Sequence, residues 1–69
     1  MEASMWGRRI RAFRKLKGYT QEGFAKYLGI SVSILGEIER GNRAPSEELL
    51  NSVAESLNIS IEDLTPKEN

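Results

Sequence analysis

The chain contains no cysteine and no histidine, and only two of its 69 residues are proline. Without cysteine, neither a disulfide nor a thiolate metal site can stabilise the fold. Without histidine, the commonest general base and the commonest metal ligand are missing, so we expect neither an enzyme nor a metal centre. No apolar run approaches the roughly 18 residues that a membrane span requires. The start of the chain also lacks the basic-then-apolar pattern of a signal peptide, so we expect a cytoplasmic protein.

The length of the chain fits one small domain. Apolar residues make up 39% of it, an ordinary share for a globular protein. A core of this size stabilises a fold by only about 3–5 kcal/mol. We therefore expect closely packed helices, or a partner subunit, to supply the rest.

The formal net charge of zero hides an uneven distribution. Residues 1–45 carry nine basic and four acidic side chains, a net charge of +5, whereas residues 46–69 carry one basic and six acidic side chains, a net charge of −5. The first part is suited to face a polyanion and the second is not. The alternative is that both parts are ordinary solvated helix surfaces, and charge alone does not decide between them.

Apolar spacing and capping residues predict an all-α fold of five short helices. The first helix is expected over Met5–Lys17, because apolar side chains recur at helical steps before Gly18: Trp6, Ile10, Phe13 and Leu16. Trp6 is expected in the core, or alternatively in a dimer contact. Two further helices are expected between capping residues and glycines: Thr20 to Gly29 and Ser31 to Gly41.

After the linker that contains Pro45, Ser46 is expected to cap a fourth helix and Ser60 a short fifth one. The fourth has the strongest apolar periodicity in the chain, ending at Leu57. The polar residues Thr65–Asn69 are expected to form a frayed tail outside the domain.

The second and third helices are separated by little more than Gly29–Ser31. Helices joined by so short a turn must cross steeply, which is helix-turn-helix geometry. The third helix, about Val32–Arg40, would then present its outer face, and a helix fits the major groove of B-DNA. Short turns also join helices in proteins that bind nothing, so geometry alone leaves DNA binding open.

The chain resembles the Cro and phage-repressor type of helix-turn-helix domain, the XRE-like or lambda-repressor-like class. The resemblance runs from Met5 to Leu64, and its motifs occur in family order: Arg14-Lys15-Leu16-Lys17-Gly18-Tyr19-Thr20-Gln21, Phe24-Ala25, Leu28-Gly29-Ile30-Ser31 and Ile38-Glu39-Arg40-Gly41-Asn42-Arg43-Ala44-Pro45. It implies a nucleoid-associated regulator of transcription that binds a specific double-stranded DNA sequence, usually as a repressor. The docking of the third helix in the major groove is illustrated by phage repressors of this type.

The resemblance also implies roles for polar residues around the third helix. Gln21 matches a glutamine that binds a DNA phosphate at a helix N-terminus, where free amides favour an anion; the alternative is a simple helix cap. Three further residues are expected at phosphates, with solvated surface as the alternative for each: Arg40, Asn42 and Arg43. Arg14 and Glu39 match an internal ion pair, and breaking one partner of such a buried pair costs about 3–5 kcal/mol.

The residues expected to face the bases depart from those usual in relatives, which offer amide, guanidinium or hydroxyl groups. They are Val32, Ser33, Gly36 and Glu37, with Ile34 at the flank. Ser33 can bond to almost any base, Val32 can touch only a thymine methyl, and Glu37 can accept from a cytosine amine. We therefore expect a weak or unusual base-reading face, with DNA shape, dimer spacing or a partner contributing specificity.

The same positions support an alternative function. Val32, Ile34 and Tyr27 would form a small apolar patch suited to binding protein, as in an antagonist of a related regulator. The retained polar and cationic residues around the third helix favour DNA binding instead. Nothing in the sequence suggests a cofactor, a small-molecule ligand or a membrane partner.

A homodimer through the C-terminal helices is expected from the resemblance. Leu50, Ile61 and Leu64 widen the apolar stripe beyond what one core face requires, and dimers of this type bind half-sites one helical turn apart.

Overall fold

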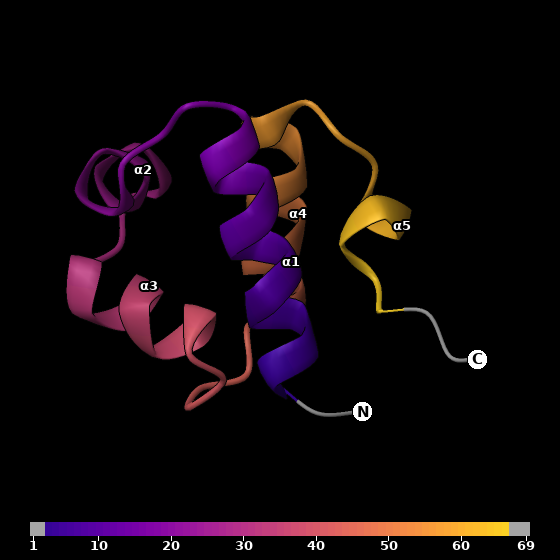
Figure 1. Ribbon diagram of the computed structural model, residues 1–69, viewed down its shortest axis with the longest axis horizontal. Helices are drawn as coiled ribbons and strands as arrows, with labels where there is room; N and C mark the ends of the chain where they lie inside the picture. Colours follow the sequence, from indigo (N-terminus) through magenta and orange to yellow (C-terminus); the bar gives the residue numbers. More distant parts are fainter. Residues whose placement is uncertain (1–2, 67–69) are drawn as a thin grey trace.

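The computed structural model describes residues 3–66, and in that range the chain forms helices joined by short loops, with no strand (Figure 1). The helices are α1 (Ala3–Leu16), α2 (Gln21–Leu28), α3 (Val32–Glu39), α4 (Glu47–Leu57) and α5 (Ile61–Leu64). The expected all-α class with five helices is confirmed. None of these helices is long and apolar enough to cross a membrane.

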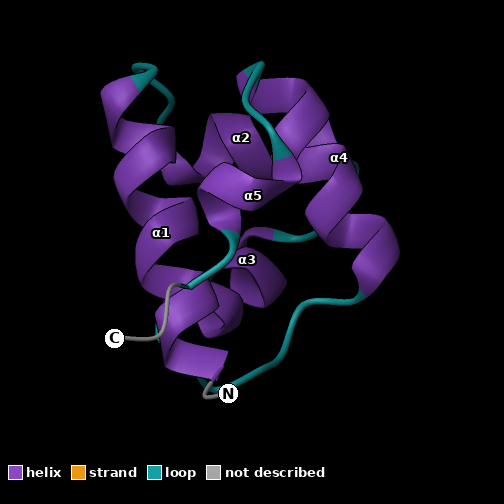
Figure 2. Ribbon diagram, turned by 90° about the vertical axis from the view of Figure 1, so that its right-hand side faces the viewer, coloured by secondary structure: helices purple, strands orange, loops and turns teal. Residues whose placement is uncertain are grey.

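Helices α1 and α4 pack against each other in the middle of the molecule, and the other helices lie around this pair. In Figure 1, α2 and α3 lie on one side of this pair, and α5 lies on the other. Turning the molecule brings α5 to the front, between α1 and α4 (Figure 2). The arrangement leaves α2 and α3 together at the edge of the molecule, remote from the C-terminal helix.

Hydroxyl side chains begin four of the helices, as the sequence predicts. The oxygen of Thr20 accepts from the amide of Gly23 at 3.0 Å, and equivalent bonds of 3.1–3.2 Å are made by Ser31, Ser46 and Ser60. Ser60 also donates its own amide to the carboxylate of Asp63 at 3.1 Å, which completes a capping box. These bonds satisfy amides that would otherwise lack a partner in the first turn.

A glycine in the left-handed conformation follows each of the helices α1 and α2 and ends it. After α2, Gly29 has a φ of 77°, and the amide of Ile30 donates to the carbonyl of Ala25 at 3.0 Å. A left-handed residue followed by such a bond is the Schellman motif, and glycine adopts it without a Cβ clash. The same motif ends α1, where Gly18 has a φ of 85° and the amide of Tyr19 donates to the carbonyl of Arg14 at 3.0 Å. The helix spans Ala3–Leu16 rather than the expected Met5–Lys17.

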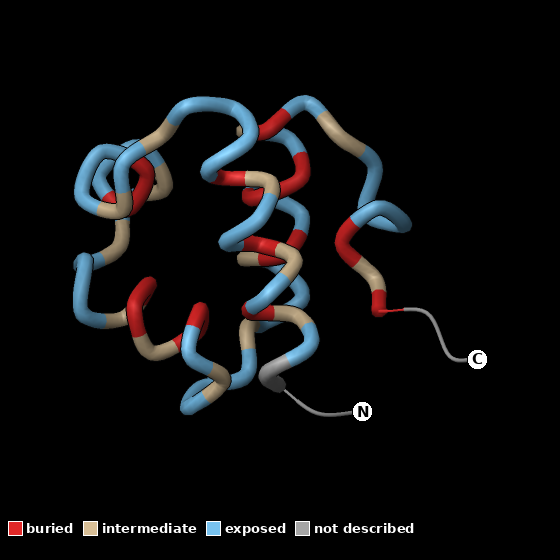
Figure 3. Tube along the Cα trace, viewed as in Figure 1, coloured by how far each residue is buried: buried red, intermediate tan, exposed pale blue. Residues whose placement is uncertain are grey.

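The core is formed by apolar side chains from every helix. Figure 3 colours all buried residues red along the Cα trace, and such segments occur in each helix. The fully buried members of the core include Ile10, Phe24, Leu35, Ile38, Val53, Leu57 and Leu64. Leu16 is an exception to the prediction, because 76% of its surface is exposed. Two consecutive steps of three residues turn a helix about 120° away from the starting face. The inward position one turn after Ile10 is taken by Arg14 instead.

The C-terminal part is more firmly packed than the sequence predicts. Leu50 and Leu64, expected to widen an outer apolar stripe, are buried in the core, and only Ile61 stays exposed, at 37%. The hydroxyl of Thr65 donates to the carbonyl of Ile61, and Pro66 is buried, so the frayed tail does not begin at residue 65. Residues 67–69 of that expected tail lie outside the described part. Trp6 packs against the core, as expected.

Candidate nucleic-acid interface

The turn between α2 and α3 holds α3 at the surface. It occupies residues 29–31, where Gly29 reverses the chain and the side chain of Ile30 packs against the core. On its inner side, α3 contributes the buried side chains of Leu35 and Ile38. The opposite side of the helix therefore faces outward, as helix-turn-helix geometry requires.

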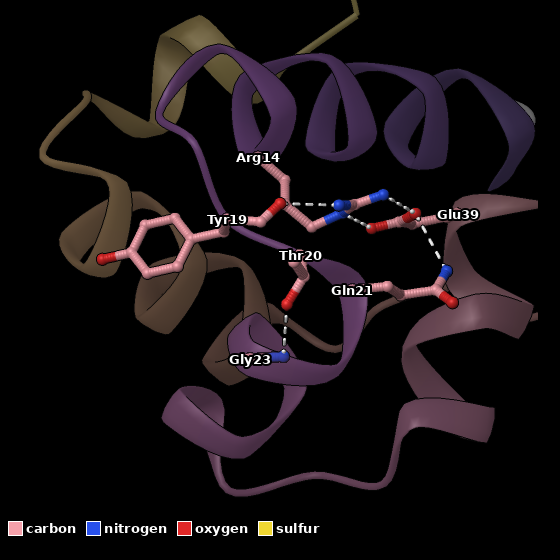
Figure 4. Close-up of polar contacts among 6 residues, drawn as sticks. All are labelled: Arg14, Tyr19, Thr20, Gln21, Gly23 and Glu39. Carbon is pink, nitrogen blue, oxygen red and sulfur yellow. Dashed lines mark hydrogen bonds and ion pairs between the residues drawn. The ribbon is translucent and has the colours of Figure 1, made fainter.

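A buried ion pair fixes the C-terminal end of α3 to α1. Nε and Nη2 of Arg14 donate to the two carboxylate oxygens of Glu39 at 2.7 and 3.1 Å (Figure 4). The side chains keep only 8% and 3% of their surface exposed. Arg14 also donates through Nη1 to the carbonyl of Tyr19 at 2.8 Å, which ties the loop before α2 to the same cluster. The structure thus contains the ion pair that the resemblance implied. The additional bond from Arg14 to the carbonyl of Tyr19 was not predicted from the sequence.

Gln21 joins this cluster rather than capping α2. Its side-chain amide donates to Oε1 of Glu39 at 3.1 Å (Figure 4). The capping oxygen of α2 belongs to Thr20, and the side chain of Gln21 is directed to Glu39 instead. An amide nitrogen has two hydrogens, so Gln21 keeps one donor for a further acceptor while Glu39 orients the side chain.

The outer face of α3 is formed by residues spaced three and four apart. Val32 is 40% exposed and Ser33 is exposed, whereas Glu37 is only partly so. Gly36, expected among the residues that face the bases, is buried. A Cβ atom built on it would lie 2.9 Å from Nη1 of Arg40, so the long side chain of Arg40 folds over this point of α3.

Glu37 and Arg43 pair with each other. Nε of Arg43 lies 2.8 Å from Oε1 of Glu37, and the two side chains remain 52% and 39% exposed respectively. The sequence predicts Glu37 at a base and Arg43 at a phosphate, and in the free chain each partly neutralises the other. Arg40 and Asn42, the remaining expected phosphate ligands, are exposed.

The apolar patch expected from Val32, Ile34 and Tyr27 is reduced. Ile34 packs against the core. Tyr27 is 64% exposed, but its ring stacks on that of Tyr19 with centroids 6.0 Å apart. One face of Tyr27 is therefore already occupied, which weakens the case for a protein-binding patch at this place.

Gly7 has a role that the sequence analysis missed. A Cβ atom at this position of α1 would lie 2.1 Å from the carbonyl oxygen of Ile38 and 2.8 Å from that of Glu39. Only glycine therefore lets α1 approach the C-terminal end of α3 this closely. The signal was available in the sequence, because a glycine inside a helix costs about 1 kcal/mol relative to alanine and calls for a reason.

Comparison with known proteins agrees with this architecture. The family model described as helix-turn-helix matches residues 10–64. YazB of Bacillus subtilis (strain 168), named as an HTH-type transcriptional regulator, is 74% identical over 68 residues, which cover 99% of each chain.

Two solved structures are similar to the whole described fold. The restriction-modification controller protein C.AhdI from Aeromonas hydrophila superposes with a TM-score of 0.85 and 33% identity, covering 91% of this chain and 96% of the other. The BldD DNA-binding domain of S. venezulae superposes with a TM-score of 0.82 and 26% identity, covering 93% and 96%. The chain belongs to the helix-turn-helix family.

Proposed function

We propose that this protein is a sequence-specific DNA-binding regulator of transcription, acting as a repressor, that inserts α3 into the major groove of a duplex. The observation that carries the proposal is the outward face of α3, which begins at Val32 and Ser33 and ends under the guanidinium of Arg40. The names of its relatives support the regulatory role: YazB is a transcriptional regulator, and the similar domain of BldD binds DNA.

Phosphate contacts would orient the domain on the duplex. Gln21 has one amide hydrogen left after its bond to Glu39, and it lies at the start of α2, where the helix dipole attracts an anion. Arg40 lies near Gln21 at the end of α3, and Asn42 is exposed in the loop that follows. Arg43 would exchange Glu37 for a phosphate, because an exposed ion pair is worth only about 0–1 kcal/mol.

Base contacts would come from the first turn of α3. The hydroxyl of Ser33 can donate to or accept from a base edge, and Val32 can touch a thymine methyl. Glu37, once Arg43 has left it, can accept from a cytosine amine. Gly36 offers no side chain, so part of the specificity would rest on DNA shape.

We also propose that the regulator acts in the cytoplasm at the nucleoid, as a homodimer through the C-terminal helices. The exposed apolar side chain of Ile61 on α5 supports this interface. Leu50 and Leu64 contribute to the monomer core instead, so the contact would be small.

Titration against a random-sequence duplex pool at two salt concentrations tests DNA binding. We expect binding that weakens steeply as salt rises, because phosphate contacts release counterions. Arg43→Ala should weaken binding to all sequences alike, and Ser33→Ala should change which sequences are recovered. Asn51→Asp on α4, which makes the same change in net charge as Arg43→Ala, serves as the control. Failure to bind any duplex at low salt, together with tight binding to a related regulator, would support the antagonist function instead.

A further inference from the structure

The first helix carries two arginines that the proposed function does not use. Arg8 and Arg11 are exposed, and within residues 5–66, whose side chains the structure describes, neither makes an ion pair or side-chain hydrogen bond. They line a groove of about 560 Å³ between α1, α2 and α3. We call it the basic groove; it is lined by Arg8, Arg11, Arg14, Gln21, Glu39 and Arg40.

The close approach of α1 to α3 forms this groove. Gly7 lies directly against the carbonyl groups of Ile38 and Glu39, so α1 crosses the last turn of α3 without an intervening side chain. Arg8 follows Gly7 in the chain, and Arg11 lies one turn further on the same face of α1. The crossing therefore brings both arginines next to Arg40.

Among the described residues that line the basic groove, Glu39 is the acidic one, and it is already neutralised. Both oxygens of Glu39 accept from Arg14, and Oε1 accepts from Gln21 as well. Four guanidinium groups and one carboxylate line the groove, so its net charge is +3. The three charges without a partner among the side chains that the structure describes belong to Arg8, Arg11 and Arg40.

The groove continues the face proposed to meet DNA. Arg40 is seven residues after Ser33, two helical turns along the same side of α3. A Cβ atom on Gly36 would lie 2.9 Å from Nη1 of Arg40 and 3.7 Å from Nε2 of Gln21, so Arg40 and Gln21 meet over this glycine. A duplex seated on α3 would bring its sugar-phosphate backbone to the mouth of the groove.

We propose that Arg8 and Arg11, together with Arg40, form a second phosphate-binding site in the basic groove, which holds the DNA backbone beyond the phosphate at the start of α2. The inference rests on the proposed function. Guanidinium groups suit this ligand because each presents a planar fork of donors to two phosphate oxygens. Such contacts add affinity without sequence information, which fits a chain whose base-reading face has few polar side chains.

The test compares the double variant R8Q/R11Q with the wild-type protein on one fixed duplex recovered from the random pool. The logarithm of the affinity falls linearly with the logarithm of the salt concentration, and we call the steepness of that line the salt slope. Each lost phosphate contact lowers the salt slope by about 0.9. We therefore expect a slope smaller by about 1.8 and, at about 50 mM salt, an affinity lower by roughly a hundredfold. The reduction should be the same on an unrelated duplex, because no base contact is removed.

The control is the double variant N51D/S52D, which makes the same change of −2 in net charge at two exposed positions of α4. Its slope should equal that of the wild type. Equal salt slopes for all three proteins, or equal losses of duplex affinity in both variants, would overturn the phosphate site. Either result would leave the proposed function intact. Absence of wild-type binding to any duplex would overturn both.

Titration with inorganic pyrophosphate separates the DNA backbone from a free anion. We expect no saturable pyrophosphate binding at millimolar concentration, because a duplex presents its phosphates to α2, α3 and the groove together. Pyrophosphate binding that R8Q/R11Q abolishes, together with an unchanged DNA slope, would assign the groove to a free anion and overturn the inference.

Discussion

Two carboxylates of α3 hold neighbouring arginines in different ways, because one carboxylate is buried and the other is not. Glu39 and its partner Arg14 are almost fully enclosed, so removing either would leave an uncompensated buried charge. Glu37 and Arg43 remain about half exposed, and water and salt screen their attraction. The first pair is therefore structural, and the second can open when a phosphate approaches.

Glu37→Gln should increase affinity for duplexes that offer no cytosine amine to Glu37. The substitution releases Arg43 and removes a negative charge that phosphates repel, so the salt slope should rise by up to about 0.9. The free energy of unfolding should change by less than about 1 kcal/mol, because the exposed pair contributes little. Anisotropy titrations with a labelled duplex measure the first effect and urea denaturation the second.

Glu55→Gln makes the same charge change on α4 and provides the control. It should leave the slope unchanged. Weaker binding by Glu37→Gln to a duplex without such a cytosine would contradict the role of Glu37 as a competitor for Arg43, whereas a loss confined to duplexes with a cytosine at this place would reflect its proposed base contact.

Side-chain partners were harder to predict than residue types. The Arg14–Glu39 pair followed from the family resemblance, but the third donor, Gln21, did not, because its partner lies 18 positions away. The side chain of Arg40 covers Gly36 only because no Cβ blocks it. Such contacts depend on how three helices come together, which no local pattern encodes.

At the scale of the helices, local signals were sufficient to predict the starts of α2, α3, α4 and α5, whereas α1 begins and ends at other residues than expected. Thr20, Ser31, Ser46 and Ser60 all accept from an amide in the first turn, as expected of their side chains. The orientation of α1 was predicted less well, since Leu16 faces solvent. The reason is the crossing at Gly7, which turns a face containing Arg14 toward α3.

Gly7→Ala should destabilise the fold although alanine favours a helix. The new methyl group would meet backbone carbonyl oxygens, which cannot rotate away, so α1 and α3 must separate. Overpacking of this kind costs roughly 1–3 kcal/mol, a large share of the stability of so small a domain. Urea denaturation measures the loss.

Gly36→Ala is the matched control. Its methyl group would meet the flexible end of Arg40 rather than backbone, and the helix gains about 1 kcal/mol of propensity. Stability should stay equal or rise. A Gly7→Ala protein as stable as Gly36→Ala would contradict the account of the α1–α3 crossing.

At the scale of the molecule, the charges divide with the fold. The basic part of the sequence forms α1, α2 and α3, and the acidic part forms α4 and α5. The sequence predicted this division, but not that Leu50 and Leu64 would complete the monomer core. Burial of those side chains depends on how α5 packs against α4 and α1, which apolar spacing alone does not fix.

Ile61→Asp should abolish the proposed homodimer without unfolding the monomer. Ile61 is exposed on α5, so a carboxylate there stays hydrated in the monomer but would be desolvated in a dimer. Sedimentation equilibrium should show a concentration-dependent dimer for the wild type and a monomer for the variant. A monomeric wild type at all concentrations, with and without duplex, would remove the C-terminal interface from the proposal.

The most direct test of DNA recognition by α3 is the change in backbone amide chemical shifts when a duplex recovered from the random pool is added to the isotope-labelled protein. We predict the largest changes at the start of α2, along Val32–Arg40 and in the loop that follows, with little change in α4. Changes concentrated in the acidic helices α4 and α5, with α3 unaffected in the bound complex, would contradict the account.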